Sequence, residues 1–106
     1  MNENSVQVEP EVFSPLQPGQ EFSKINYHFD QSGQVANVKI MDQEGRLIKT
    51  LANNVTIGLE GFFRWDGERD DGSLARIGYY VVWFEVFDLT GFVNTIRKRV
   101  VIGARD

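Results

Sequence analysis

The segment GYYVVWFEVFDLTGFVNTIRKRVVI, from Gly78 to Ile102, sets the architecture of this chain. Two runs rich in β-branched and aromatic residues flank the tetrapeptide DLTG, which begins at Asp88 and ends at Gly91. Such runs favour strands. The pattern Asp-x-x-Gly is typical of a type I turn that glycine closes in the left-handed conformation. The segment is therefore predicted to form a long β-hairpin.

The charged residues of this segment determine how its two strands pair. A two-residue loop without a bulge would bury Arg97 and Arg99 beside the apolar face of the first strand. A one-residue glycine bulge instead pairs Phe84 with Ile96 and turns both arginines outward. Because a shift of one residue exchanges the two faces of a strand, the bulged turn is predicted.

Strand patterns and turns continue through the rest of the chain. Asp-x-x-Gly recurs at Asp42–Gly45 and at Asp30–Gly33, where it fits an unbulged turn or a crossover between sheets. Residues Asn53–Gly61 are predicted to form a loop, with room for a short strand over Val55–Ile57. Four further segments show the alternation of a β-strand: Phe22–Phe29, Val35–Met41, Arg46–Ala52 and Phe62–Asp66.

Length and pattern together indicate one all-β domain. The chain has 106 residues, which suits a single domain with a modest core, and no stretch keeps the apolar spacing of a helix. About seven short strands predict an immunoglobulin-like β-sandwich of antiparallel strands over residues 12–106. Residues 1–11 are expected to form an N-terminal extension that can supply an edge strand, because Pro10 cannot donate a hydrogen bond to a sheet.

Composition argues against several classes of protein. The chain has no cysteine and a single histidine, His28, so disulfides, thiolate nucleophiles and two-histidine metal motifs are ruled out. Its slightly acidic and patternless charge balance, with a net charge of −4, argues against nucleic-acid binding, because phosphates demand clustered lysine and arginine. No apolar run is long enough to cross a membrane, and the N-terminus lacks the pattern of a signal peptide. Neither an enzyme site nor a cofactor is expected, and His28 is interpreted as a structural residue.

An ordered series of motifs resembles a known family. The series consists of Phe13-Ser14-Pro15, VKIMDQEGRLIKTL at 38–51, GFFRWDG at 61–67, Asp71-Gly72, Gly78-Tyr79-Tyr80 and RKRVV at 97–101. It is similar to the Ig-like domain named after the flagellar hook-capping protein. Among such domains, it most resembles the one at the C-terminus of bacterial lamin-tail-domain-containing secreted and surface proteins. The resemblance extends from Val12 to Ile102.

This resemblance implies a non-catalytic, C-terminal accessory domain of an exported bacterial protein, located outside the cell or at its surface. The implied partner is another protein or a neighbouring domain of the parent chain. The isolated domain is expected to be monomeric and not to insert into a membrane. Two other functions stay open: a C-terminal sorting domain of the Por (type IX) secretion system, and a carbohydrate-binding module that uses Trp83 and Tyr79.

Four acidic residues crowd one predicted turn. The calcium loop of an EF-hand needs glycine at its sixth position and glutamate at its twelfth. Counted from Asp66, these positions hold Asp71 and Ile77. The simpler interpretation is a polar turn whose carboxylates accept hydrogen bonds from backbone amides. The alternative is a weak cation site, and its candidate ligands are Asp66, Glu68, Asp70 and Asp71.

The outer side of the predicted hairpin is the best candidate for a binding surface. The bulged register places Tyr79, Trp83, Arg97 and Arg99 on this one side, and aromatic residues beside arginines are typical of protein contacts. Cross-strand packing alone is the simpler interpretation, in which Arg97 lies over Trp83 and pairs with Glu85. Burial against a preceding domain and stacking of carbohydrate are the remaining alternatives.

Overall fold

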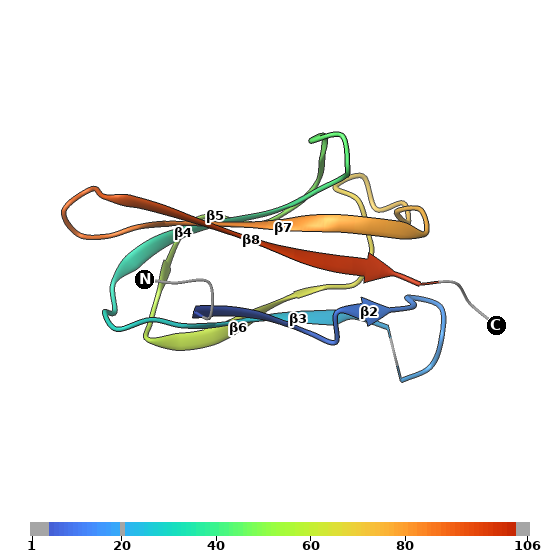
Figure 1. Ribbon diagram of the computed structural model, residues 1–106, viewed down its shortest axis with the longest axis horizontal. Coiled ribbons are helices and arrows are strands. Elements are labelled where there is room, and N and C mark those ends of the chain that lie inside the picture. The colour runs from blue at the N-terminus through green and yellow to red at the C-terminus, as the bar shows by residue number, and fades with distance from the viewer. Residues whose placement is uncertain (1–4, 20, 104–106) are drawn as a thin grey trace.

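The computed structural model describes residues 5–19 and 21–103, which form a two-layer β-sandwich (Figure 1). No described residue lies in an α-helix, and none of the described segments forms a helix suited to crossing a membrane. The strands of the sandwich are β1 (Val6–Glu9), β2 (Val12–Phe13), β3 (Ser23–His28), β4 (Gln34–Met41), β5 (Leu47–Ile57), β6 (Glu60–Trp65), β7 (Gly78–Phe87) and β8 (Val93–Ile102).

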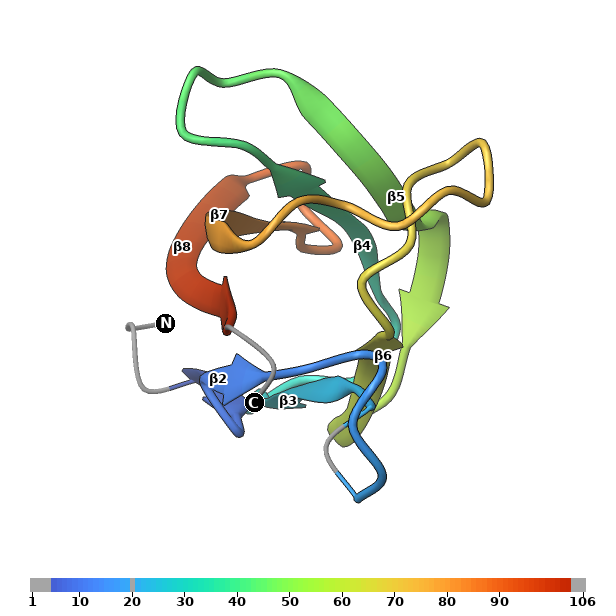
Figure 2. The same cartoon turned by 90° about the vertical axis from the view of Figure 1, so that its right-hand side faces the viewer.

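These strands divide between a three-stranded and a five-stranded sheet. The order is β1-β3-β6 in the first sheet and β2-β8-β7-β4-β5 in the second. Figure 2 shows β8, β7, β4 and β5 curving around one side of the sandwich, with β3 and β6 on the other. Neighbouring strands are antiparallel except β2 and β8, which run parallel with Val12 opposite Val101. The all-β sandwich is confirmed, but the expectation of antiparallel pairing is wrong for this one pair. The exception arises because the chain changes sheet between β1 and β2, which places β2 beside the last strand.

The C-terminal hairpin has the predicted bulged register. Strands β7 and β8 pair Phe84 with Ile96. The Gly91 amide donates a hydrogen bond to the Asp88 carbonyl oxygen at 3.0 Å, and Gly91 has a φ of 88°. Arg97 is exposed on the far side of the sheet from the core. The left-handed glycine therefore sets which side chains of both strands face inward.

Asp88 stabilises this turn with its side chain. The Oδ1 atom accepts hydrogen bonds from the Thr90 hydroxyl at 2.7 Å and from the amides of Thr90 and Phe92 at 2.9 Å. The bond from the Thr90 hydroxyl is the largest cause that lowers the pKa of Asp88 below its ordinary value of 3.8, and the backbone amides act in the same direction. The folded state therefore favours the ionised form of this carboxyl.

We expect Asp88→Asn to change how stability depends on pH. A carboxyl whose pKa is lower in the folded state stabilises the fold above its unfolded pKa, and this contribution disappears as the pH falls through the folded pKa. The unfolding free energy of the wild type should therefore exceed that of Asp88→Asn near neutral pH, and the difference should shrink below pH 3.8. Urea denaturation at a series of pH values measures the unfolding free energy of the wild type and of Asp88→Asn. A difference that stays constant down to about pH 2 would contradict this expectation.

Inward-facing side chains of both sheets form one core. Along β7 the even-numbered residues from Tyr80 are buried, and the odd-numbered ones are half-buried or exposed, as the alternation of a strand requires. Trp65 of β6 is fully buried in edge-on contact with Phe13 and Tyr80, at ring-centroid distances of 5.6 and 5.3 Å. A second group of rings surrounds Phe84 and consists of Tyr27, Phe29 and Phe63.

The prediction of a loop over Asn53–Gly61 is wrong except for the short strand over Val55–Ile57, which is the end of β5. Strand β5 continues unbroken to Ile57 before the short connection to β6. Adjacent asparagines are typical of turns, but Asn54 takes a φ of 54° within the strand, where the pairing of β4 with β5 shifts. The Asn54 amide donates to the side-chain oxygen of Asn37 on β4 at 2.8 Å. This side chain supplies a hydrogen-bond partner at a bulge, so the strand does not have to end there.

Two features of the N-terminal half agree with the strand pattern. The turn at Asp30–Gly33 joins β3 of one sheet to β4 of the other, so it is a crossover, which was one of its two predicted forms. Strand β1 lies at the edge of the three-stranded sheet, where β3 is its neighbour. Val6 of β1 is fully buried, so this edge strand contributes to the core.

Candidate functional site

The five-stranded sheet presents aromatic and basic side chains on the surface that faces away from the core. Strand β7 lies at the centre of this surface, between β4 and β8. The register places Lys39 of β4 on one side of Trp83 and Arg97 of β8 on the other. We define the outer face as Asn37, Lys39 and Met41 of β4, Tyr79, Val81, Trp83, Glu85 and Phe87 of β7, and Thr95, Arg97 and Arg99 of β8.

A stacked pair marks the middle of the outer face. The guanidinium carbon of Arg97 lies 4.5 Å from the centroid of the Trp83 ring, where the electron-rich face of the indole attracts a cation. This packing agrees with the sequence analysis. The expected ion pair between Arg97 and Glu85 is absent from the part of the chain that the structure describes. The Glu85 carboxylate instead accepts a hydrogen bond from the Asn37 side-chain amide at 3.5 Å, on the opposite side of β7.

The other two predicted contact residues lie on the same surface. Arg99 is opposite Val81 in the β-ladder, and its Nε atom is 3.4 Å from a carboxylate oxygen of Glu11. The Arg99 side chain is 63% exposed, so this ion pair adds little to stability and leaves much of the guanidinium accessible. Tyr79, at the start of β7, is also exposed. The structure thus places all four predicted residues on the outer face, with Arg97 and Trp83 in direct contact.

Sequence reasoning missed the contribution of β4 to this surface. Lys39 lies opposite Trp83, and Met41 lies opposite Val81. Alternation along the strand indicates that both side chains point away from the core. It does not indicate which strand lies beside β7, because strand order depends on contacts between distant parts of the chain. The outer face therefore holds a third cation that only the sheet order reveals.

Strand β8 also leaves part of its backbone without a neighbouring strand on one side. Over the described range, β2 pairs with β8 at Val101 and Ile102 only. Earlier in β8, backbone groups on that side have no strand partner among residues 5–19 and 21–103. Arg97, Lys98 and Arg99 lie in this part of the strand, and charged side chains on an edge strand oppose uncontrolled pairing with other chains.

The acidic candidates for a cation site lie in the loop that follows β6. Three of their carboxylates accept hydrogen bonds from backbone amides: Asp66 from Glu68 at 3.2 Å, Asp70 from Thr50 at 3.0 Å and Asp71 from Ser73 at 2.9 Å. The Ser73 hydroxyl also donates to Asp71, and this bond is the main cause that lowers the pKa of that carboxyl. Within the described residues, no group of three or more histidine, aspartate or glutamate side chains is placed to hold a metal ion. The geometry of the loop matches a polar turn that is stabilised by its own carboxylates.

His28 lies at the end of β3, opposite Glu60 of β6, and is exposed. A catalytic base needs a nucleophile within hydrogen-bond reach and is oriented by a third group. Among the described residues, none forms a hydrogen bond or ion pair with the His28 ring. The ring therefore has no orienting partner in this part of the chain.

Comparisons with known proteins identify the fold. No protein-family model matches the chain, and no curated protein matches it. Among solved structures, CopC from Methylosinus trichosporium OB3b is similar, with a TM-score of 0.56 and 16% sequence identity over 95% of this chain and 93% of that chain. FlgD from Xanthomonas campestris, a protein of the hook capping that is essential for flagellar assembly, is similar with a TM-score of 0.58 and 24% identity.

The match to FlgD covers 76% of this chain and 57% of the FlgD chain. Identities of 16% and 24% show a shared fold and nothing finer. The all-β sandwich fold, which the strand pattern indicated, is therefore shared with both structures.

Proposed function

We propose that this chain is a non-catalytic accessory domain that binds another protein, or a neighbouring domain of its parent chain, through the outer face. The stacked pair of Trp83 and Arg97, 4.5 Å apart, carries the proposal. Tryptophan and arginine are over-represented among the residues that dominate binding energy at protein interfaces. Because two paired strands hold this pair in place before a partner arrives, less conformational entropy is lost on binding.

The charges of the outer face favour an acidic partner surface. Lys39, Arg97 and Arg99 outnumber Glu85 on this face, which is therefore basic although the whole chain has a net charge of −4. Opposite charges on two surfaces accelerate their association and select against wrong partners. Carbohydrate stacking is less favoured by the same geometry, because the Arg97 guanidinium covers one face of the Trp83 ring.

The proposal includes an exported bacterial parent protein, with this domain at its C-terminus and outside the cell or at its surface. Two observations support this setting. The ordered motifs resemble the terminal domain of lamin-tail-domain-containing proteins, and the fold is shared with FlgD, a protein of flagellar hook capping. The domain would take no cofactor and would be monomeric when isolated.

Site-specific photo-crosslinking in the full-length parent protein tests the proposal. A photoreactive phenylalanine analogue replaces Thr95 on the outer face or, as a control, Phe62, which is exposed on the three-stranded sheet. We expect a defined crosslinked product from position 95 that position 62 does not give. Mass spectrometry of the linked peptides then distinguishes a separate protein from a neighbouring domain of the same chain.

Charge reversal on the two sheets provides the matched control. Arg97→Glu should remove the product formed from position 95, whereas Lys24→Glu on the three-stranded sheet should leave it unchanged. Lys24 suits this purpose because it also lies over an aromatic ring, that of Phe62, at 4.8 Å. Identical products from positions 95 and 62, or a product insensitive to Arg97→Glu, would refute binding through the outer face.

A further inference from the structure

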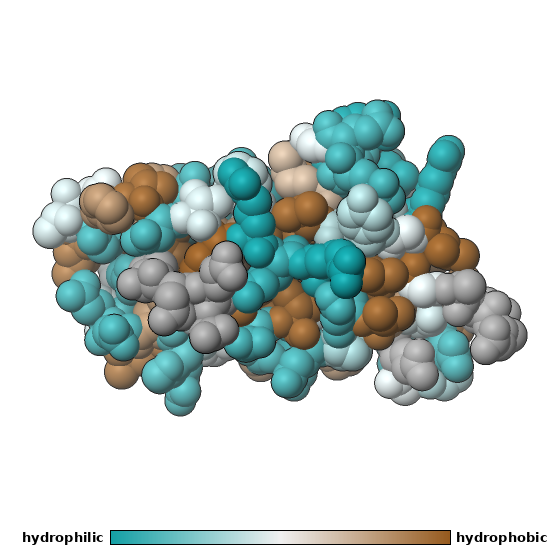
Figure 3. Space-filling model, viewed as in Figure 1, coloured by the Kyte–Doolittle hydropathy of each residue, from teal (hydrophilic) through white to brown (hydrophobic). Residues whose placement is uncertain are grey.

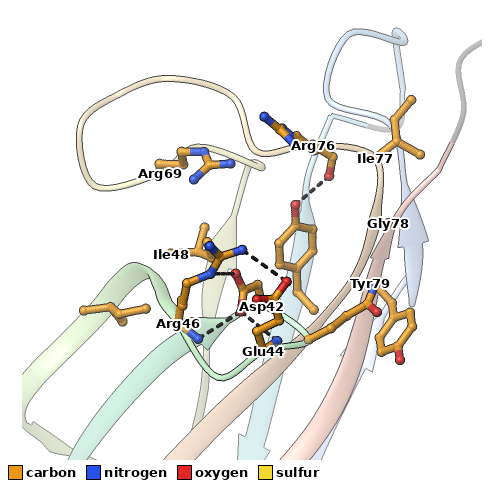
Figure 4. A pocket seen from close by; sticks show the side chains of 12 residues that line it. Asp42, Glu44, Arg46, Ile48, Arg69, Arg76, Ile77, Gly78 and Tyr79 are labelled. Atoms are coloured by element: carbon orange, nitrogen blue, oxygen red, sulfur yellow. Dashed lines mark hydrogen bonds and ion pairs between the residues drawn. The ribbon is translucent and has the colours of Figure 1, made fainter.

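A pocket of about 520 Å³ opens beside the hairpin turn between β4 and β5. Figure 4 shows that its walls come from three separate parts of the chain: the turn at Asp42–Gly45 with the start of β5, the loop after β6, and the segment that leads into β7. These parts contribute three arginines, Arg46, Arg69 and Arg76. Tyr79 lines one side of the pocket, at the border with the outer face.

The acidic groups of the pocket are already paired. The Nε atom of Arg46 is 2.8 Å from Oδ2 of Asp42, and its terminal nitrogen is 3.5 Å from Oε1 of Glu44. The Oδ1 atom of Asp42 accepts two further bonds, from the amides of Glu44 and Arg46, both at 2.9 Å. The bond from the Arg46 amide is the main cause that lowers the pKa of Asp42. One arginine therefore pairs with both carboxylates.

The remaining two arginines have no such partner. Over the described residues, no hydrogen bond or ion pair reaches the guanidinium of Arg69 or of Arg76. In Figure 4 the two side chains extend toward one another above the Arg46 ion pair. Three cations and two carboxylates line the pocket, so its lining side chains carry one net positive charge. The Asp71 carboxylate, which interacts electrostatically with Arg69, lies outside this lining.

Hydrogen bonds hold the backbone of both arginines in position. The Arg69 amide donates to the Ser73 carbonyl oxygen at 2.7 Å, and the following Asp70 amide donates to the Ile48 carbonyl oxygen of β5 at 2.9 Å. The Tyr80 hydroxyl donates to the Arg76 carbonyl oxygen at 2.6 Å. Because Tyr80 is buried in the core, this bond anchors the backbone of Arg76. Hydrogen bonds within the chain therefore fix the backbone that carries the two guanidinium groups.

We infer that this pocket binds a carboxylate group carried by a peptide. A planar guanidinium matches a carboxylate with two parallel hydrogen bonds, and Arg69 and Arg76 each offer unused donors. A single negative charge also balances the one net positive charge of the lining side chains. A phosphate dianion would leave an excess of negative charge beside Asp42 and Glu44. The carboxylate can come from an acidic side chain or from a free chain terminus, and the experiment separates these sources.

The test is an NMR titration of the ¹⁵N-labelled chain with three peptides at low ionic strength, where exposed charges are weakly screened. The first peptide is a pentapeptide with both ends blocked, in which glutamate is the central residue and all the others are glycine. The second is a pentaglycine with a blocked N-terminus and a free carboxyl terminus, and the third has both ends blocked and no carboxylate. We expect saturable shifts of the Arg69 and Gly78 amides with the first or the second peptide and none with the third. The peptide that binds identifies the source of the carboxylate.

Three variants of equal net charge then test the role of the two arginines, and one of them is the control. Arg69→Gln and Arg76→Gln should each weaken binding about tenfold, or about 1.4 kcal/mol. Arg64→Gln removes the same charge from the three-stranded sheet, where Arg64 lies over the Phe22 ring at 5.0 Å, and should leave binding unchanged. The inference is overturned by equal shifts with the third peptide, by no saturable shift with the first two, or by an equal effect of Arg64→Gln. None of these results bears on Trp83 and Arg97, so the outer-face proposal is tested separately.

Discussion

Trp65→Ala is expected to lower the free energy of unfolding by about 3–5 kcal/mol. The indole is fully buried and contacts the rings of Phe13 and Tyr80 edge-on. Its Nε1 atom donates to the Glu68 carbonyl oxygen at 2.9 Å. The substitution therefore opens a cavity between the sheets and also removes the partner of a carbonyl oxygen in the loop after β6. Urea denaturation followed by circular dichroism measures the change.

The second tryptophan of the chain is the matched control. Trp83 lies half-buried on the outer face, so Trp83→Ala should cost only about 1 kcal/mol. Trp65→Phe should fall between the two alanine variants, because it keeps a ring in the core but loses the hydrogen bond to Glu68. Equal losses for Trp65→Ala and Trp83→Ala would contradict the placement of Trp65 in the core.

Gly67→Ala is expected to destabilise the fold by about 2–4 kcal/mol, for two independent reasons. Gly67 has a φ of 85°, which is unfavourable for any residue with a Cβ atom. A Cβ atom at this position would also lie 2.6 Å from Cγ of Pro15, well inside van der Waals contact. Because this proline ring packs where the loop after β6 meets the segment after β2, relief of the clash requires one of these segments to move.

Another glycine of the same loop separates the cost of the backbone conformation from the cost of the clash with Pro15. Gly72 has a φ of 87°, but a Cβ atom there would meet nothing within 4 Å. Gly72→Ala should therefore show the backbone cost alone, about 1–2 kcal/mol, in the same denaturation experiment. The further loss in Gly67→Ala reports the contact with Pro15. If both substitutions cost the same, the close packing of Gly67 against Pro15 is not what stabilises this loop.

The C-terminal hairpin could be predicted in detail because all the information needed is local. Arg97 and Arg99 cannot both face a core, and a single glycine bulge after Asp88 is enough to turn them outward. The pairing of Phe84 with Ile96 follows directly and is found in the structure. The contact between Arg97 and Trp83 could be predicted for the same reason, since the two residues are opposite each other in that register.

Features that depend on distant segments could not be predicted in this way. The bulge at Asn54 is compatible with a long strand because Asn37, on another strand, supplies a hydrogen-bond partner. The position of Lys39 beside Trp83 depends on the order of strands in the sheet, which alternation does not determine. The pocket is the extreme case, because its arginines come from a hairpin, a loop and the approach to β7. No spacing within the chain brings Arg46, Arg69 and Arg76 together.

The position of β8 between β2 and β7 also affects when the fold can be completed. β2 is among the first strands to be synthesised, yet its partner in the sheet, Val101 opposite Val12, is among the last residues described. The chain must therefore close a loop from Val12 to Val101 before this pair forms, and such long-range contacts slow folding. Until the ribosome has released β8, the core also lacks Ile96, Val100 and Ile102. The five-stranded sheet is thus completed only after β8 has been translated.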